Sequence, residues 1–238
     1  MNIALIGYGK MGKEIEKIAT SRGHKIKLII DISNQHDLTV ENLKECDVAI
    51  EFTIPKSAVQ NYFTCFEAGV PVVSGTTGWL EKKDEVYAKC KEKNGTFFYA
   101  SNFAIGVNLF FELNKKLAEL MAKWPDFEVE MTEVHHIHKL DAPSGTAISL
   151  ADDILQILPG KESWVNDKTP EKNQINIKSE RRGEVPGIHS IKYESEVDFI
   201  EITHETKNRK GLATGAVLAA EYCKEHSGIL TMKDLLNI

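Results

Sequence analysis

Three histidines and a lysine fall within five consecutive positions near the middle of the 238-residue chain. The segment EVHHIHKLDAPSGTA contains them as His135, His136, His138 and Lys139. Histidine transfers protons near neutral pH and also binds metal ions, so the segment could support acid–base catalysis or a zinc site. We favour acid–base chemistry, because alternation along a strand would turn His135 away from His136 and His138. The neighbouring lysine would also repel a cation, and we therefore predict no metal site.

The residues that follow suit a bound anion. Ser144, Gly145 and Thr146 precede a run with helical periodicity, so they would present backbone N–H groups and two hydroxyls at the positive end of a helix. Lys139 adds a full positive charge, and a histidine beside an anion can act as a general acid. The alternative is a polar strand edge with solvated histidines. We predict an anion site with a proton donor.

A second motif lies near the N-terminus. The sequence GYGKMG, residues 7–12, has the spacing G-x-G-x-x-G between a strand-like run and a helical one. In such a loop Gly7 permits the tight turn, Gly9 lets a pyrophosphate approach the backbone, and Gly12 allows the helix to pack on the strand. Asp31 ends the next strand, where a carboxylate can bind ribose hydroxyls. We predict a dinucleotide site; turn glycines with a solvated aspartate are the alternative.

Asp31 also bears on the choice between nicotinamide cofactors. Its charge would repel the ribose phosphate of NADPH, and residues 32–34 contain no arginine to pair with that phosphate. We expect NADH to bind at least as well as NADPH.

The elements around the glycine loop alternate in type. Up to about residue 105, strand-like runs alternate with helical ones, which predicts a parallel sheet covered on both faces. Ligands of such sheets bind beyond the carboxyl ends of the strands. Two segments would lie there, Glu51-Phe52-Thr53 and Gly75-Thr76-Thr77-Gly78. We expect the second of them to hold a nicotinamide ring.

The second half of the chain has a different pattern. A helical run follows residue 105, and a half-buried strand is expected over residues 127–138. Later strands follow one another without intervening helices, which predicts an open mixed or antiparallel sheet. The fold class is therefore α/β, with a Rossmann-type doubly wound parallel sheet and a second α+β domain. The dinucleotide-binding domain would comprise residues 1–105 and 212–238, and the substrate-binding and oligomerisation domain residues 106–211.

Composition narrows the classes of partner. The chain carries 29 basic and 35 acidic side chains, a formal net charge of −6, and the two signs are well mixed. This disfavours nucleic acids and anionic membranes, which attract clustered lysine and arginine. The sequence contains no apolar run of membrane-spanning length, no signal-peptide pattern and no paired cysteine spacing. We expect a globular cytoplasmic protein without nucleic-acid or membrane partners.

The central segment closely resembles a known signature. Its pattern HHxxKxDAPSGTA is typical of 4-hydroxy-tetrahydrodipicolinate reductases, which use NAD(P)H in diaminopimelate and lysine synthesis. GYGKMG is similar to that family's glycine loop, SGTTG to its nicotinamide loop, and ASNFAIGVN to its passage into the second domain. EITHET and GAVLAA resemble its closing segment. The resemblance covers nearly the whole chain in the same order.

The resemblance implies roles for individual residues. His135 matches the general acid, Lys139 the lysine that faces the substrate, and His136 a histidine that contacts it. The substrate is a small cyclic dicarboxylate, and the Ser144-Gly145-Thr146 helix start would bind one carboxylate. Hydride would come from NADH or NADPH and a proton from His135. The cofactor residues expected from motifs and resemblance together are Gly7, Tyr8, Gly9, Lys10, Met11, Gly12, Asp31, Phe52, Thr53, Gly75, Thr76, Thr77, Ser101, Asn102 and Phe103.

Two positions depart from the family's usual pattern. Lys10 stands where many members have arginine, which keeps the charge and loses the bidentate fork, and Ile137 stands where some have arginine. Members are typically homotetramers joined through the second domain, so a homotetramer is expected. The resemblance leaves Arg181, Arg182 and Arg209 without assigned roles.

Two other functions fit the same pattern. One is another two-domain NAD(P)-dependent imine or amino-acid reductase, because function lies in the site rather than in the fold. The other is a nucleotide-sensing protein without catalysis.

Overall fold

The computed structural model describes residues 1–208 and 210–238 and divides into two compact units. The first contains Met1–Ile105 and Lys210–Ile238, so the chain leaves this unit and returns to complete it. The second contains the described residues from 106 to 208. Arg209, whose role the sequence left open, lies outside the described residues.

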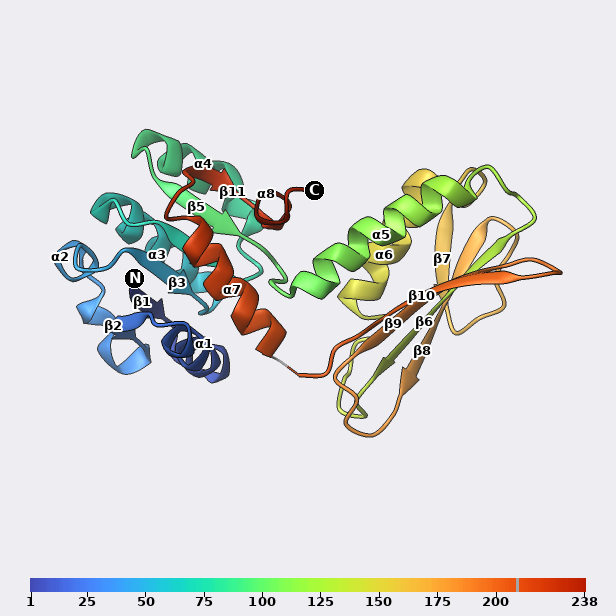
Figure 1. Cartoon of the computed structure of the whole chain (residues 1–238), viewed down its shortest axis with the longest axis horizontal. Coiled ribbons are helices and arrows are strands. Elements are labelled where there is room, and N and C mark those ends of the chain that lie inside the picture. The colour runs from blue at the N-terminus through green and yellow to red at the C-terminus, as the bar shows by residue number, and fades with distance from the viewer. Residues whose placement is uncertain (209) are drawn as a thin grey trace. The chain divides into compact units, whose positions relative to one another are not determined.

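A six-stranded parallel sheet forms the centre of the first unit, in the order β11-β5-β4-β3-β1-β2 (Figure 1). The sequence NIALI of β1 is almost wholly apolar because both faces of the sheet are covered. The strands are β1 (Asn2–Ile6), β2 (Lys25–Ile30), β3 (Val48–Glu51), β4 (Val72–Ser74), β5 (Thr96–Tyr99) and β11 (Gly228–Leu230).

Helices cover both faces of this sheet. One hydrophobic core, which includes Ile15 and Val217, joins the strands to α1, α7 and α8. A second, which includes Tyr62 and Cys90, joins them to α2, α3 and α4. The predicted doubly wound sheet is confirmed. The helices are α1 (Lys10–Ser21), η1 (Ile32–Asp37), α2 (Val40–Leu43), α3 (Pro55–Ala68), η2 (Leu80–Lys82), α4 (Lys83–Glu92), α7 (Lys210–Tyr222) and α8 (Met232–Leu236).

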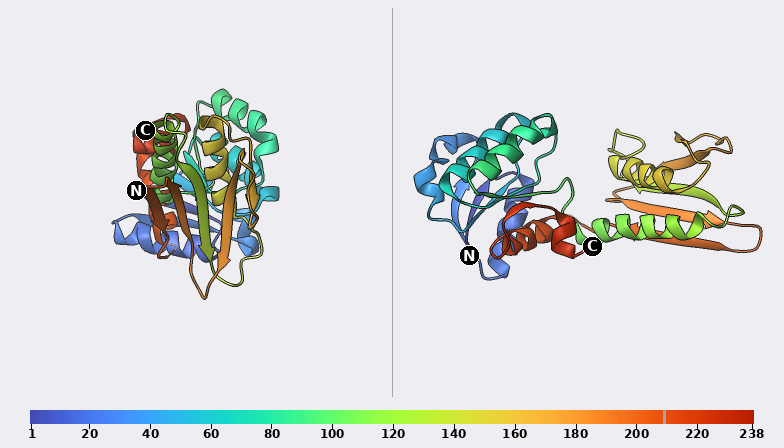
Figure 2. Two further views of the ribbon diagram at one scale, coloured as in Figure 1. Left: turned by 90° about the vertical axis from the view of Figure 1, so that its right-hand side faces the viewer. Right: turned by 90° about the horizontal axis from the view of Figure 1, so that it is seen from above.

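A mixed five-stranded sheet and two helices form the second unit (Figures 1 and 2). The order is β10-β9-β6-β8-β7; β6, β8 and β7 are parallel, whereas β9 is antiparallel to β6 and β10. Helices α5 and α6 cover one face through a core that includes Leu117, Leu150 and Tyr193. The predicted second α+β architecture is confirmed. Its elements are α5 (Ile105–Met121), β6 (Glu128–His135), α6 (Gly145–Ile157), β7 (Ser163–Asn166), β8 (Gln174–Arg181), β9 (Ile188–Glu194) and β10 (Phe199–Glu205).

The strand expected over residues 127–138 ends earlier than predicted. Strand β6 stops at His135, and the backbone turns so that Lys139 N–H donates to the carbonyl of His136 at 3.1 Å. The expectation that His136 and His138 continue the strand is therefore wrong. Within β6 the alternation does hold, and it places Glu133 and His135 on one face of the sheet.

All four cysteines are buried thiols. Among the described residues, we find no helix with both the length and the apolar character needed to cross a membrane.

Candidate active site

The glycine loop before α1 leaves room for a dinucleotide. Gly7 has a φ of 96°, and a Cβ there would lie 2.0 Å from the carbonyl oxygen of Phe52. A Cβ at Gly12 would lie 2.2 Å from the carbonyl oxygen of Gly7, so α1 can approach the loop only because residue 12 lacks a side chain. At Gly9 a Cβ would meet nothing within 4 Å, and the backbone there is open to a ligand. These three environments fit pyrophosphate binding at a helix N-terminus.

A cavity of about 420 Å³ lies beside this loop. It is formed beyond the carboxyl ends of β1, β2 and β3, the usual place for a ligand in a doubly wound sheet. Six predicted cofactor residues line it, namely Gly7, Tyr8, Gly9, Asp31, Phe52 and Thr53, together with Ile30, Ile32, Gln35, Ile54 and Ser57.

Phe52 and Thr53 bring the second predicted loop to the same place. The hydroxyl oxygen of Thr76 accepts a hydrogen bond from Thr53 N–H at 2.8 Å. The ring of Phe52 occupies the space beside Gly75, where a Cβ would lie 2.2 Å from it, and its centroid is 5.8 Å from that of Phe103. The ends of β3 and β4 and the segment after β5 therefore meet around one aromatic side chain.

The remaining predicted cofactor residues do not line this cavity. Lys10, Thr77 and Ser101 are exposed, and Met11 packs against the first core. The side-chain oxygen of Asn102 accepts from Ala104 N–H at 2.9 Å, within the segment that follows β5.

The carboxyl of Glu51 lies beneath the loops at the end of β3. It is fully buried and accepts hydrogen bonds from the hydroxyls of Thr53 and Ser74, the latter at 2.8 Å, and from the Asn61 amide at 3.4 Å. Burial raises the pKa of Glu51, and these hydrogen bonds oppose the rise. The sequence placed this residue at a strand end and gave it no role, because two of its partners, Asn61 and Ser74, come from α3 and β4.

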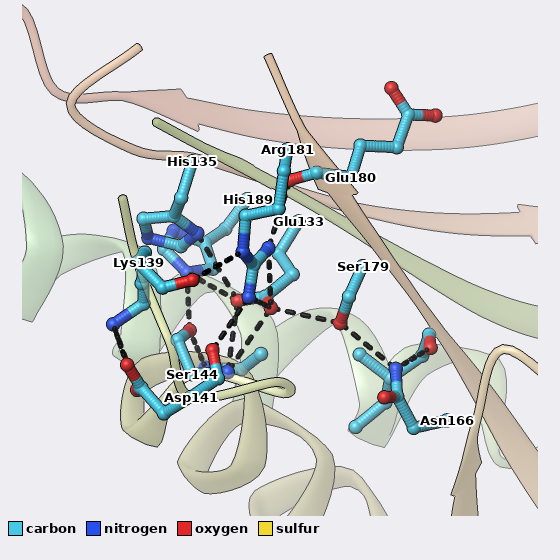
Figure 3. Close-up of polar contacts among 12 residues, drawn as sticks. Glu133, His135, Lys139, Asp141, Ser144, Asn166, Ser179, Glu180, Arg181 and His189 are labelled. Atoms are coloured by element: carbon cyan, nitrogen blue, oxygen red, sulfur yellow. Dashed lines mark hydrogen bonds and ion pairs between the residues drawn. The ribbon is translucent and has the colours of Figure 1, made fainter. Parts of the chain in front are cut away.

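In the second unit, hydrogen bonds converge on the buried carboxylate of Glu133 (Figure 3). Ser144 N–H lies 3.1 Å from both of its oxygens, and the hydroxyl of Ser179 donates at 2.9 Å. The guanidinium of Arg181 forms an ion pair with Oε1 at 3.4 Å. Burial alone would raise the pKa of Glu133, but these hydrogen bonds and the adjacent His135 hold it below its usual value. The group is therefore an anion at neutral pH.

Two buried imidazoles lie against this carboxylate. His135 Nδ1 is 3.4 Å and His189 Nε2 is 3.8 Å from Glu133 Oε2, and the two rings meet edge to face with centroids 5.1 Å apart. His189 Nε2 also shares a hydrogen bond with Ser144 Oγ at 3.2 Å. Burial lowers the pKa of both histidines, that of His189 to about 4, while Glu133 opposes the decrease. His189 is therefore neutral at pH 7.

Lys139 and Asp141 lie in the turn after β6 (Figure 3). Lys139 Nζ donates to both carboxylate oxygens of Asp141 at 2.8 Å, which lowers the pKa of that carboxyl. Arg181 donates to the backbone oxygens of Lys139 at 3.2 Å and Asp141 at 2.6 Å, and so holds the turn against β8. The positive charge of Lys139 lies near enough to His135 to lower the pKa of its imidazole.

The start of α6 combines a capped helix with an open backbone. Ser144 Oγ accepts a hydrogen bond from Ala147 N–H at 3.2 Å, while its own N–H donates to Glu133. Gly145 is exposed, and a Cβ there would meet nothing within 4 Å. Thr146 follows in the first turn. This helix terminus can therefore receive a carboxylate.

The side chains of His136, His138 and Arg182 lie outside this network. His136 is partly buried with its ring 6.1 Å from that of His138, which pairs with Glu184 on the surface at 3.4 Å. Arg182 has an exposed side chain, and its N–H donates to the carbonyl of His135 at 2.8 Å.

Sheet register brings together residues that the sequence did not connect. In β6 and β9, Glu133 pairs directly with His189; in β6 and β8, Glu133 pairs with Ser179, and His135 with Arg181. Glu133, Ser179 and His189 were not predicted as site residues, and Arg181 was left unassigned. The one local signal was the spacing of Glu133 and His135, two positions apart on one strand face.

Glu133, His135 and His189 also lie close enough to hold a metal ion, since their potential ligand atoms fall within 4.8 Å of one another. However, Ser144 N–H and the Arg181 cation already occupy the carboxylate, and a metal ion there would lie beside the guanidinium. We interpret the cluster as an acid–base network, and the absence of a metal site stays a prediction.

Known proteins match the chain over its full length. The family model "Dihydrodipicolinate reductase, N-terminus" matches residues 1–103, and "Dihydrodipicolinate reductase, C-terminus" matches residues 106–236. The 4-hydroxy-tetrahydrodipicolinate reductase of Christiangramia forsetii is 52% identical over 100% of this chain and 98% of its own. That of Methanosarcina acetivorans is 34% identical over 99% of this chain and 89% of its own.

A solved structure agrees with these relatives. The dipicolinate-bound dihydrodipicolinate reductase from Paenisporosarcina sp. TG-14 superposes with a TM-score of 0.77 and 26% identity, covering 97% of each chain. With both halves matched by the family models and one relative 52% identical end to end, the chain belongs to the dihydrodipicolinate reductase family of oxidoreductases.

Proposed function

We propose that the chain reduces 4-hydroxy-tetrahydrodipicolinate to tetrahydrodipicolinate with a hydride from NADH or NADPH. The observation that carries the proposal is that His135 and Ser144 at the start of α6 both contact Glu133, with the charge of Lys139 acting on His135, in a chain whose other unit holds an open glycine loop. The names of the two curated relatives state this activity for those proteins. The first unit would bind the dinucleotide, and the second the substrate.

Each residue of the proposed site has a separate role in substrate binding or catalysis. Gly145 and Thr146, with Ser144, bind one carboxylate at the positive end of α6, and Lys139 attracts the dicarboxylate by its charge. His136 contacts the ring of the substrate. When bound, the nicotinamide supplies the hydride. The hydroxyl at position 4 leaves as water with a hydrogen from the adjacent ring carbon, and after hydride addition His135 gives a proton back to that carbon.

The first unit supports cofactor binding through the residues at its strand ends. Gly9 leaves the backbone open for a pyrophosphate, and Asp31 lines the cavity where a ribose would bind. The carboxylate of Asp31 would repel a ribose phosphate, so NADH binds at least as well as NADPH. A comparison of kcat/KM with the two cofactors tests this, and a large preference for NADPH would contradict it.

The activity is tested by supplying the condensation product of pyruvate and aspartate semialdehyde and following the loss of NADH or NADPH absorbance. Steady oxidation that falls about 100-fold in His135→Gln, with the affinity for cofactor unchanged, is the expected result. The control is His138→Gln, which changes a surface histidine of the same segment whose side chain is 70% exposed.

Other outcomes separate the alternatives. If NADH or NADPH is oxidised only when other imines or amino-acid precursors are supplied as substrates, the chain is a different reductase. Cofactor binding without turnover on any of these compounds would indicate a nucleotide sensor. Near-normal turnover in His135→Gln would contradict the assignment of the general acid.

The expected homotetramer and cytoplasmic location belong to the same proposal. Strand β10 lies at the edge of the second sheet, and Val197, Phe199 and Ile200 on or beside it are 89%, 57% and 44% exposed. An edge strand with exposed apolar side chains can pair with another subunit. Four buried thiols fit a reducing compartment.

A further inference from the structure

We propose that Glu133 is a positioning residue that orients His135 for proton donation from Nε2, and that Gly187 keeps that nitrogen accessible. The inference rests on the proposed function, because it concerns the proton donor of that reaction. It adds two residues, from β6 and from the loop before β9, to which the sequence gave no role.

The two nitrogens of His135 have different surroundings. Nδ1 is buried and faces Glu133 Oε2 at 3.4 Å, an ion-pair distance without a well-aligned hydrogen bond. A hydrogen bond between a protonated imidazole and a carboxylate is charge-assisted, and it is therefore shorter and stronger than a neutral one. Nε2 faces Gly187, where a Cβ would lie 3.1 Å from it. A proton on Nδ1 is thus retained by the carboxylate, and the proton that can leave is the one on Nε2.

Glu133 is held in one orientation. Ser144 N–H bridges its two oxygens, Ser179 donates to Oε1, and Arg181 pairs with the same oxygen. These contacts leave Oε2 directed at the imidazoles of His135 and His189. A fully buried carboxylate with this many donors stays charged, so it stabilises a protonated imidazole in a site where burial disfavours one.

The charges around His135 oppose one another. Glu133 and Asp141 favour the imidazolium, whereas Lys139 and Arg181 disfavour it. His189, whose other titratable neighbours include His204, stays neutral and packs edge to face on the ring of His135. Because Glu133 is the favourable charge in direct contact, its removal would leave the cationic neighbours dominant.

The central test is Glu133→Gln, which keeps an acceptor for Ser144 and Ser179 and removes the charge. The pKa of His135 should then fall. Since proton donation needs the protonated imidazole, the alkaline limb of the kcat profile should move to lower pH by about one unit. We expect kcat to fall about 100-fold, with the dissociation constant of NADH unchanged. Glu133→Asp, which keeps the charge, should restore the position of the limb.

The matched control is Glu130→Gln, which changes a carboxylate of the same strand whose side chain is 59% exposed. It should leave kcat and its pH profile unchanged. If Glu133 serves only the fold, Glu133→Gln will lower the melting temperature and the active fraction without moving the limb, and that result would overturn the proposal.

Gly187→Ala tests whether Gly187 keeps Nε2 of His135 accessible. Its added methyl group would lie against Nε2 and should lower kcat at least 10-fold, with the alkaline limb in place because Glu133 remains. Unchanged kcat in this variant would show that Nε2 is not the donor.

A readout without turnover separates this proposal from the proposed function. Nitrogen-15 NMR of His135 reports the tautomer and the imidazole pKa in the full chain. A protonated Nδ1 in the wild type, together with a lower imidazole pKa in Glu133→Gln, would support the positioning role even if no substrate is turned over. An unchanged pKa would overturn the positioning role even in an active reductase.

Discussion

Single side chains in the second unit have their chemistry set by burial and by one or two neighbours. His189 shows this most clearly, because its imidazole lies between Glu133 and the ring of His135 with almost no contact with water. Desolvation outweighs the attraction of the carboxylate, and the pKa of His189 falls to about 4.

Buried His189 predicts a loss of stability in acid. In the unfolded chain an imidazole takes up a proton near pH 6.5, whereas His189 in the folded chain does so near pH 4. The unfolded state thus binds more protons between these values, and the free energy of unfolding should fall on acidification by up to about 3 kcal/mol. His135, whose pKa is also lowered, acts in the same direction.

Urea unfolding at pH 7.5 and pH 4.5 checks this prediction. His189→Gln should flatten the pH dependence, while His36→Gln, at a side chain that is 80% exposed, should not. A pH dependence equal to that of the wild type in His189→Gln would contradict the assignment.

Lys139 predicts a coupled loss of binding and turnover. In Lys139→Ala the attraction for a substrate carboxylate is lost, so KM should rise about 10- to 100-fold and kcat should fall with it. Lys178→Ala on β8, at a side chain that is 60% exposed, is the control. Unchanged affinity for the substrate would remove Lys139 from the anion site.

At the scale of elements, two glycines where β1 leads into α1 have different surroundings. Gly12 lies where α1 meets the carbonyl of Gly7, whereas Gly9 borders open space. The two positions therefore separate packing from ligand binding.

Gly12→Ala should lower the free energy of unfolding by about 1–3 kcal/mol, because the new methyl group overlaps a backbone carbonyl. Gly9→Ala should leave stability nearly unchanged and weaken NADH binding, because its methyl group projects where the pyrophosphate would lie. Thermal unfolding and fluorescence titration with NADH measure the two effects. Equal NADH affinity in Gly9→Ala and the wild type would argue against a pyrophosphate at this loop.

At the scale of the whole molecule, we propose that subunits assemble through the second unit. We expect a mass near four times the 26.7 kDa chain in sedimentation equilibrium. Phe199→Glu on the edge strand β10 should reduce that mass, because it places a charge among exposed apolar side chains. Leu80→Glu, at an exposed leucine of the first unit, is the control. A monomeric wild type would contradict the proposed assembly.

Much of the architecture could be predicted from the sequence because it depends on local patterns. Apolar runs that alternate with helical periodicity gave the doubly wound sheet, and successive strands gave the second one. Local patterns could not show that β6 ends at His135, because that end depends on a turn fixed by Arg181 from another strand.

By itself, the sequence determined the glycine loop, the helix start at Ser144 and the presence of His135 and Lys139 in one short segment, since each is a short motif whose chemistry follows from adjacent residues. Only the tertiary structure decided which groups surround His135. Glu133, Arg181 and His189 lie on three strands, and the register of β6 with β8 and β9 places them around one imidazole. Register is set by hydrogen bonds between distant segments, so no local pattern records it.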